Sequence, residues 1–85
     1  MPKKDNVKNI EGILKSFLEK ETGHSVRNRT ANLVQKGIIS SFHMFQLIDF
    51  IEKKFKVRVD ISKLKPENFN SLETITRRVT VWMSE

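Results

Sequence analysis

The sequence predicts an all-α fold, a small bundle of three main helices plus one short helix, with a long loop between the first two helices. Two observations favour this class. Apolar residues recur at helical spacing in three separate stretches, and the only stretch that alternates like a strand has no second strand to pair with. Eighty-five residues suffice for one small domain, so we expect a single domain over 1–85, with a flexible terminus at 1–5.

The first helix is expected from about Asn6 to Glu21, where apolar residues recur every three or four positions. Gly23 is placed to end it. Residues 23–40 then form a long loop, and loops of that length in compact domains usually indicate function or hidden structure. Its apolar residues are expected to hold it against the core: Leu33, Val34, Ile38 and Ile39.

The second helix has the clearest pattern. Its apolar residues fall at i, i+3, i+4, i+7 and i+11, which places them on one buried stripe: Met44, Leu47, Ile48, Ile51 and Phe55. Ser40 is expected to be the N-cap, because its hydroxyl can accept a free amide proton from the first turn. Ser41 would then be the first helical residue.

The remainder predicts one short helix and one longer helix. The segment 57–61 alternates apolar and charged residues, but an isolated strand is not stable, so no strand is expected there. Leu64 to Phe69 is expected to form one or two helical turns. Asn70, with Glu73 three residues later, is expected to cap the last helix. That helix has an apolar face: Leu72, Ile75, Val79 and Trp82.

Composition narrows the functional classes. Without cysteine, disulfides, thiol catalysis and cysteine-ligated zinc are excluded. No apolar run approaches the ~20 residues that span a bilayer, and the first residues lack the apolar stretch of a secretory signal. We therefore expect a cytoplasmic protein that does not insert into membranes. The net charge of +6 favours an acidic partner, but the basic residues are spread along the chain without a dense cationic helix.

The pair Ser40–Ser41 is the strongest candidate site. Unpaired N–H groups and the macrodipole at a helix start favour negative charge, so a phosphate attached there would be stabilised. On the expected helix, Ser41 lies beside Phe42, Phe45 and Asp49, which are off the buried stripe. A hydroxyl beside exposed aromatic residues indicates an attachment point within a docking surface.

Four stretches in chain order carry a family resemblance: GIISSF, HMFQLIDFIEKKF, VRVDI and LKPENFNSLETI. From Leu33 to about Val79 the chain resembles the acyl carrier protein and peptidyl carrier domain family. The family pattern is a G-I/L-x-D-S-L/F core, a helix ending in phenylalanine, a hydrophobic segment and an L-x-P-E-N-F-x-S-L-x-x-I run. The matching spacing, through Phe55 and Pro66 to Phe69, makes this resemblance specific.

The resemblance implies that Ser41 carries a covalent 4′-phosphopantetheine arm, added from coenzyme A by a phosphopantetheinyl transferase. Its thiol would hold an acyl or aminoacyl group as a thioester and deliver it to loading and transferring enzymes. A carrier catalyses nothing, so no enzyme activity is expected. No metal site is expected either, because His24 stands alone in a polar loop without a set of ligands for a metal. Fatty acyl carriers of lipid metabolism and fatty acid biosynthesis, polyketide, amino acid and D-alanyl carriers share this architecture, so the cargo stays open.

Two residue sets complete the prediction. The partner surface is expected to comprise Ser40, Phe42, Phe45, Gln46, Asp49 and Glu52. The core and any cargo cavity, between the second and third helices, are expected to comprise Met44, Leu47, Ile48, Ile51, Phe55, Ile61, Leu64 and Phe69. A free-standing monomer is expected.

Departures from the family pattern keep alternatives open. The family usually has aspartate where this chain has Ser40, and acidic positions of its second helix are here Gln46, Lys53 and Lys54. The surface is therefore near neutral, so the protein either has dedicated partners or is an unmodified carrier-like scaffold. Ser40 itself could be the attachment site, and a pair between Ser41 and His43 is disfavoured because residues i and i+2 face different sides of a helix. A basic nucleic-acid-binding domain is the alternative of another class.

Overall fold

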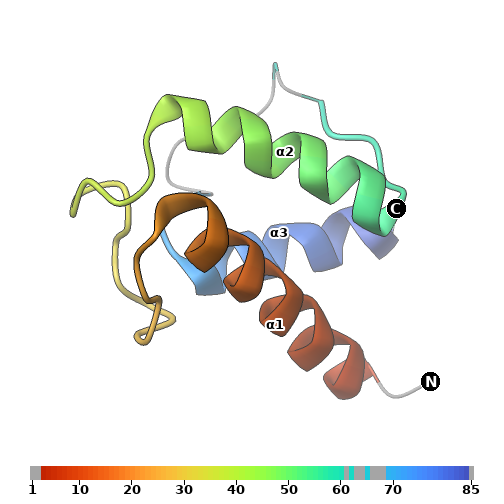
Figure 1. Cartoon of the computed structure of the whole chain (residues 1–85). Helices are drawn as coiled ribbons and strands as arrows, with labels where there is room; N and C mark the ends of the chain where they lie inside the picture. Colours follow the sequence, from red (N-terminus) through yellow and green to blue (C-terminus); the bar gives the residue numbers. More distant parts are fainter. Residues whose placement is uncertain (1–2, 61, 63–64, 66–68, 85) are drawn as a thin grey trace.

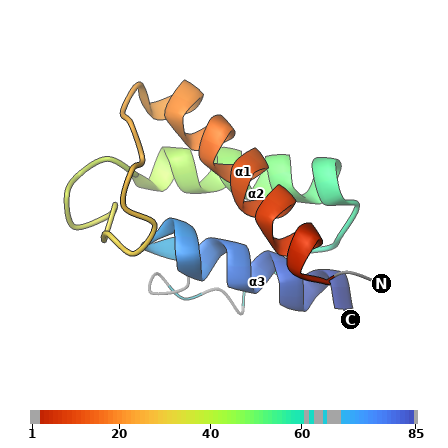
Figure 2. The ribbon, with the colours of Figure 1, turned by 90° about the horizontal axis from the view of Figure 1, so that it is seen from below.

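The computed structural model describes residues 3–60, 62, 65 and 69–84, and these form an all-helical bundle. Its helices are α1 (Lys3–Thr22), α2 (Ser41–Phe55) and α3 (Leu72–Ser84), as Figure 1 shows, and the described residues contain no strand. Figure 2 shows α1 running diagonally across both α2 and α3, which themselves run in the same general direction. The predicted all-α class is therefore confirmed.

One hydrophobic core joins the three helices, and α1 packs more extensively against α3 than against α2. The apolar stripe predicted for α2 is confirmed: Leu47, Ile48 and Ile51 are buried, and Met44 and Phe55 pack against the core partly buried. The predicted apolar face of α3 is buried as well: Leu72, Ile75, Val79 and Trp82. The α1 contribution comes from Ile10, Leu14 and Leu18.

The first helix differs from the prediction at its beginning. It starts at Lys3, ahead of the predicted Asn6, so residues 3–5 are helical and not part of an irregular terminus. Those residues include neither glycine nor proline, so nothing in their backbone chemistry stops the helix there. Its end was predicted correctly: Gly23 adopts φ 73°, and its N–H donates to the carbonyl of Glu19 at 2.9 Å.

Most of the long loop after α1 is held against the core. Leu33 and Ile39 are buried and Ile38 is half-buried, as predicted. The Ile38 and Ile39 N–H groups both donate to the Leu33 carbonyl, at 2.9 and 3.2 Å. Val34, however, is 38% exposed, so its predicted core role is wrong. Val34 lies in a turn that is closed by a hydrogen bond from the Gly37 N–H to the Val34 carbonyl, at 3.0 Å. The Val34 side chain lies at the surface of this turn.

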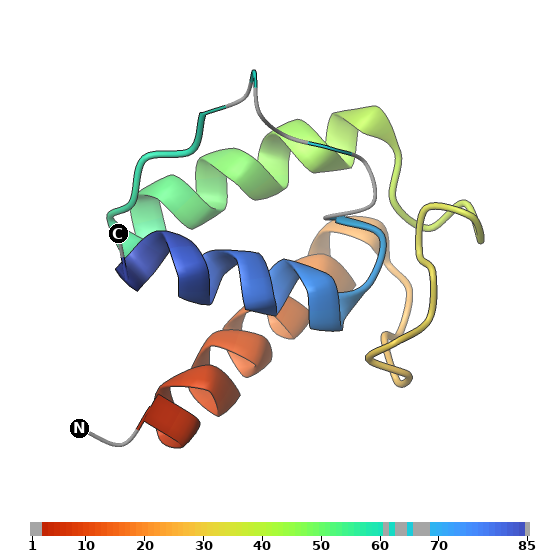
Figure 3. The same cartoon turned by 180° about the vertical axis from the view of Figure 1, so that it is seen from behind.

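Residues 56–60, which follow α2, form no helix or strand and leave the end of α2 as the teal trace in Figure 3. Val59 is buried and the predicted absence of a strand holds for the described part of this segment. Phe69 is only 1% exposed and contacts Trp82, with ring centroids 6.0 Å apart. Most of the predicted short helix, and the predicted core residues Ile61 and Leu64, lie outside the described residues.

The cap of α3 is Ser71 and not the predicted Asn70. The Ser71 hydroxyl accepts the Thr74 N–H at 3.1 Å, and the Thr74 hydroxyl accepts the Ser71 N–H at 3.2 Å. This reciprocal pair makes a capping box one residue later than predicted. The prediction had the Glu73 side chain bonding back to the Asn70 N–H. The Glu73 carboxylate instead contacts Arg29 at 3.2 Å, and the Glu73 N–H donates to the Arg29 carbonyl at 2.8 Å.

Candidate functional site

The site is built on the start of α2, where Ser40 is the N-cap as predicted. Ser40 has extended backbone angles, φ −100° and ψ 177°, and its carbonyl accepts the Met44 N–H at 3.0 Å. The Ser40 hydroxyl accepts the His43 N–H at 3.4 Å, and the His43 Nδ1 atom accepts the Ser40 N–H at 3.1 Å. This capping box fixes the point at which the helix begins.

Ser41 is the first residue of α2 and is exposed, as predicted. The helix itself supplies no partner for the N–H groups of its first turn, and its dipole makes that end partially positive. No acidic residue lies in the first turn of α2. A negatively charged group joined to the Ser41 oxygen would therefore meet backbone donors and a favourable field without a competing carboxylate from that turn.

His43 contacts Ser40 and not Ser41. Its Nδ1 atom lies 3.1 Å from the Ser40 hydroxyl oxygen, in addition to the contact with the Ser40 N–H. The spacing of N-cap and N3 residues, i and i+3, was the sequence signal for this contact, and the prediction overlooked it. The described residues contain no group of three or more side chains that could hold a metal ion.

The predicted partner surface is only partly exposed. Phe42 and Phe45 are 67% and 62% exposed, and Asp49 is exposed beside them at positions i, i+3 and i+7 of one helix face. Gln46 is half-buried. Glu52 is half-buried too, and its carboxylate accepts the Val59 N–H at 3.0 Å, so it holds the segment that follows α2. The structure therefore brings three of these side chains together on an open face.

The predicted core and cargo residues that the structure describes are packed in the interior or against it. Leu47, Ile51 and Phe69 are nearly inaccessible to solvent. A groove that the sequence analysis missed lies elsewhere, between α1 and α2, where the rings of Phe17 and Phe50 stack with centroids 4.1 Å apart. Its signal in the sequence was a second apolar stripe on α1, at Ile13 and Phe17, next to the buried stripe.

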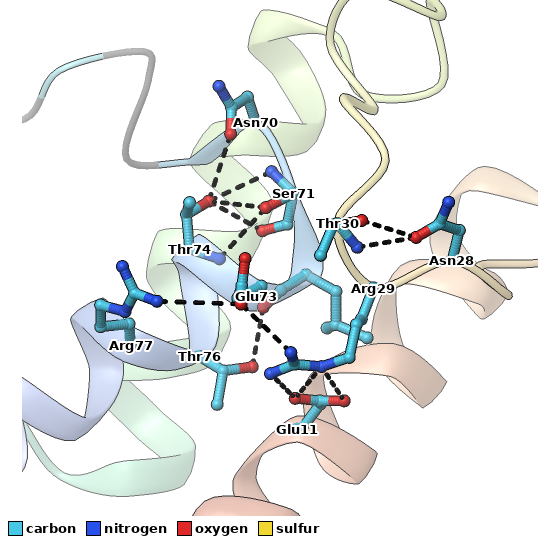
Figure 4. A network of polar contacts seen from close by, with 11 residues as sticks. Glu11, Asn28, Arg29, Thr30, Asn70, Ser71, Glu73, Thr74, Thr76 and Arg77 are labelled. Carbon is cyan, nitrogen blue, oxygen red and sulfur yellow. Dashed lines mark hydrogen bonds and ion pairs between the residues drawn. The ribbon is translucent and has the colours of Figure 1, made fainter.

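Arg29 fixes the loop that leads to the site, as Figure 4 shows. Its guanidinium contacts the Glu11 carboxylate of α1 at 2.9 Å and the Glu73 carboxylate of α3 at 3.2 Å. The hydrogen bonds that Arg29 donates to the Glu11 carboxylate raise the pKa of Arg29. The negative charges of Glu11 and Glu73 raise this pKa further, whereas desolvation lowers it. Arg29 therefore stays cationic and ties the loop to both helices.

No family model and no curated protein matches this sequence. Among the helices of the described residues, none has the length and apolar character required to cross a membrane.

Proposed function

We propose that the protein is a carrier that holds an acyl or aminoacyl group as a thioester on a 4′-phosphopantetheine arm at Ser41. The observation that supports this most directly is the position of Ser41, exposed at the capped start of α2 beside the exposed rings of Phe42 and Phe45. The resemblance of residues 33–79 to carrier proteins supplies the chemistry that such a hydroxyl would undergo.

The attachment is a phosphoryl transfer. The Ser41 oxygen attacks the phosphorus atom next to the pantetheine portion of coenzyme A, a phosphodiester forms, and adenosine 3′,5′-bisphosphate leaves. The hydroxyl proton passes to a base of the phosphopantetheinyl transferase. The new phosphodiester keeps one negative charge at the positive end of α2, which favours the modified state. The thiol at the end of the arm then exchanges acyl or aminoacyl groups with partner enzymes.

The partners of such a carrier would not rely on basic patches. Lys53 and Lys54 lie in the last turn of α2, and Asp49 is paired with Lys53 at 3.2 Å. The face around Ser41 therefore offers two exposed aromatic rings and little net charge. We expect partners that bind it through apolar contact, with association rates that depend weakly on salt.

Intact-mass analysis after incubation with coenzyme A and a phosphopantetheinyl transferase tests the proposal. The wild-type chain should gain one phosphopantetheinyl group, and Ser41→Ala should gain none. Ser40→Asp is the matched control, because aspartate caps helices as well as serine does and leaves Ser41 in place. This variant should be modified at least as well as the wild type. Modification of Ser41→Ala would move the attachment site to Ser40.

An unmodified carrier-like scaffold is the second candidate, and one observation favours it. Phe42 and Phe45 are open to a partner whether or not Ser41 carries a group. Under this hypothesis neither a promiscuous transferase nor the transferase of the source organism would modify the wild-type chain. Lack of modification in both reactions, with the protein folded, would replace the carrier proposal by the scaffold.

A further inference from the structure

The groove between α1 and α2 has an apolar floor. Two adjoining hollows have volumes of about 440 and 730 Å³, and the stacked rings of Phe17 and Phe50 line both of them and form this floor. The ring planes lie within 16° of parallel, and neither ring is fully buried. Ile13 extends the apolar surface along α1. Phe17 and Phe50 pack against the hydrophobic core but are only half-buried. The floor therefore leaves aromatic and aliphatic surface exposed to solvent.

Lysines surround this floor. Lys8, Lys20 and Lys54 line the larger hollow, and in the part of the chain that the structure describes none of them makes an ion pair. Lys53 lines the smaller hollow and is already paired with Asp49 at 3.2 Å. Of the side chains that the structure describes, Glu21 is the one carboxylate that lines the larger hollow. With a net charge of +6 on the whole chain, three ammonium groups against one carboxylate around an apolar groove fit an anionic, partly apolar ligand.

We propose that this groove binds an acidic amphipathic helix of a partner protein. Such a helix would lay apolar side chains at i, i+3 and i+4 on the floor, and its carboxylates would meet Lys8, Lys20 and Lys54. The α1 side of the groove allows a partner helix to approach closely, because Gly12 has no side chain and Ser16 has a small one. The space beside Gly12 is open, since a Cβ atom placed there would meet nothing within 4 Å.

The carboxylates of the groove favour a protein helix over other anions. Glu21 and Asp49 lie in the same groove as the lysines, and these carboxylates would repel the closely spaced phosphates of a nucleic acid or an anionic bilayer. A helix with discrete carboxylates can place them beside the lysines and away from Glu21 and Asp49.

The proposal does not depend on attachment at Ser41. Gln46 and Asp49 line the groove, whereas Phe42 and Phe45 do not, so the groove adjoins the face of α2 that carries Phe42 and Phe45 and shares only Asp49 with it. Binding can therefore be measured on the unmodified chain, and failure of one proposal leaves the other intact.

The test is a titration of the ¹⁵N-labelled full chain with a synthetic peptide of about 18 residues, long enough for five helical turns. The peptide carries leucine at i, i+3, i+4 and i+7 and glutamate at most other positions, and a matched peptide carries lysine for glutamate. The acidic peptide should give saturable shifts confined to residues 8–21 and 46–54. The lysine peptide should give none, and raising the salt from about 50 to about 300 mM should weaken binding several-fold.

Charge variants show which lysines are responsible. Lys20→Glu with Lys54→Glu should weaken binding about tenfold. Lys36→Glu with Lys65→Glu is the matched control, since both lysines are exposed, lie outside the groove and give the same change in net charge. The control should bind within about twofold of wild type. Circular dichroism of each variant confirms the fold, and Lys20→Gln with Lys54→Gln should give an intermediate affinity.

Several results would overturn the proposal. These are the absence of saturable binding by the acidic peptide, shifts centred on Phe42 and Phe45, or an equal loss of affinity in the control variant. Tighter binding at the same residues by a single-stranded oligonucleotide, or by vesicles of phosphatidylglycerol, would assign the groove to a different class of partner.

Discussion

Among the residues that the structure describes, Lys56 is the one non-glycine residue with a positive φ. It follows the last residue of α2 and adopts the left-handed conformation, with φ 55° and ψ 45°. Most helices that end this way use glycine, because a Cβ atom makes the left-handed region unfavourable. Gly23 occupies the corresponding position after α1, with φ 73°. The chain thus ends two helices with one geometry and two different residues.

The variant Lys56→Gly should therefore be more stable than the wild type. Removing the Cβ atom relieves the left-handed strain, and we expect the free energy of unfolding to rise by about 1 kcal/mol. Lys54→Gly is the control, because it places glycine inside the same helix and should lower the free energy of unfolding by about 1 kcal/mol. Urea denaturation followed by circular dichroism measures both. A loss of stability in Lys56→Gly would show that the Lys56 side chain makes a compensating contact.

In both α1 and α2, a glutamate near the C-terminus accepts a hydrogen bond from the backbone that follows the helix. Glu19 accepts the N–H of the buried Val26 at 2.7 Å, and Glu52 accepts the N–H of the buried Val59 at 3.0 Å. In each case the carboxylate and the valine are seven residues apart. Acidic residues near a helix C-terminus are unfavourable for the dipole. Here the bond to a returning backbone N–H explains why they are present.

Loss of the Glu52 carboxylate should destabilise the protein. The Glu52→Ala variant leaves the partly buried N–H of Val59 without its hydrogen-bond acceptor. The free energy of unfolding should therefore fall by about 1–2 kcal/mol. Asp49→Ala removes a carboxylate from the exposed face of the same helix, where its pair with Lys53 should contribute below about 1 kcal/mol. Equal effects of the two changes in thermal denaturation would contradict a structural role for Glu52.

Regular patterns made the helices predictable. The stripe from Met44 to Phe55 and the serine cap of α2 follow from local spacing and hydrogen-bond chemistry, and both are present in the structure. The prediction failed in two situations. In one, two neighbouring residues were equally suitable for the same role; in the other, the contact joins residues that no local pattern connects. Serine and asparagine cap helices about equally well, so residue type alone did not distinguish Ser71 from Asn70. Both residues lie where tertiary hydrogen bonds meet, from the Glu73 N–H to the Arg29 carbonyl and from the Leu33 N–H to the Asn70 carbonyl. Glu52 resembled a surface carboxylate because no pattern in the sequence reveals the return of Val59.

For the whole molecule, the arrangement of Arg29 explains how a long loop can be ordered between α1 and α2. One guanidinium contacts α1 through Glu11 and α3 through Glu73, and the Arg29 carbonyl accepts the Glu73 N–H. Close by, the Leu33 N–H donates to the Asn70 carbonyl. Side chain and backbone together hold the loop against the middle of α1 and the start of α3 (Figure 4). The position of α2, and of Ser41 at its start, depends on this junction.

Arg29→Gln should loosen this junction while the helical core persists. Glutamine cannot replace the two ion pairs, so the amide protons of Leu33 and Glu73 should exchange with solvent faster than in the wild type. The amide of Ile51, in the buried face of α2, should keep its protection. Because both ion pairs are partly exposed, added salt should also speed exchange at Leu33 and Glu73 in the wild-type chain.

Arg27→Gln provides the matched comparison, since Arg27 lies exposed in the same loop and makes no ion pair among the described residues. It makes the same change of charge and side chain, and hydrogen exchange at Leu33 and Glu73 should match the wild type. If both variants accelerated exchange equally, net charge and not the bridge from Arg29 would account for the order of the loop. If neither did, the backbone hydrogen bonds of Leu33 and Glu73 would suffice to position the segment that leads to Ser41.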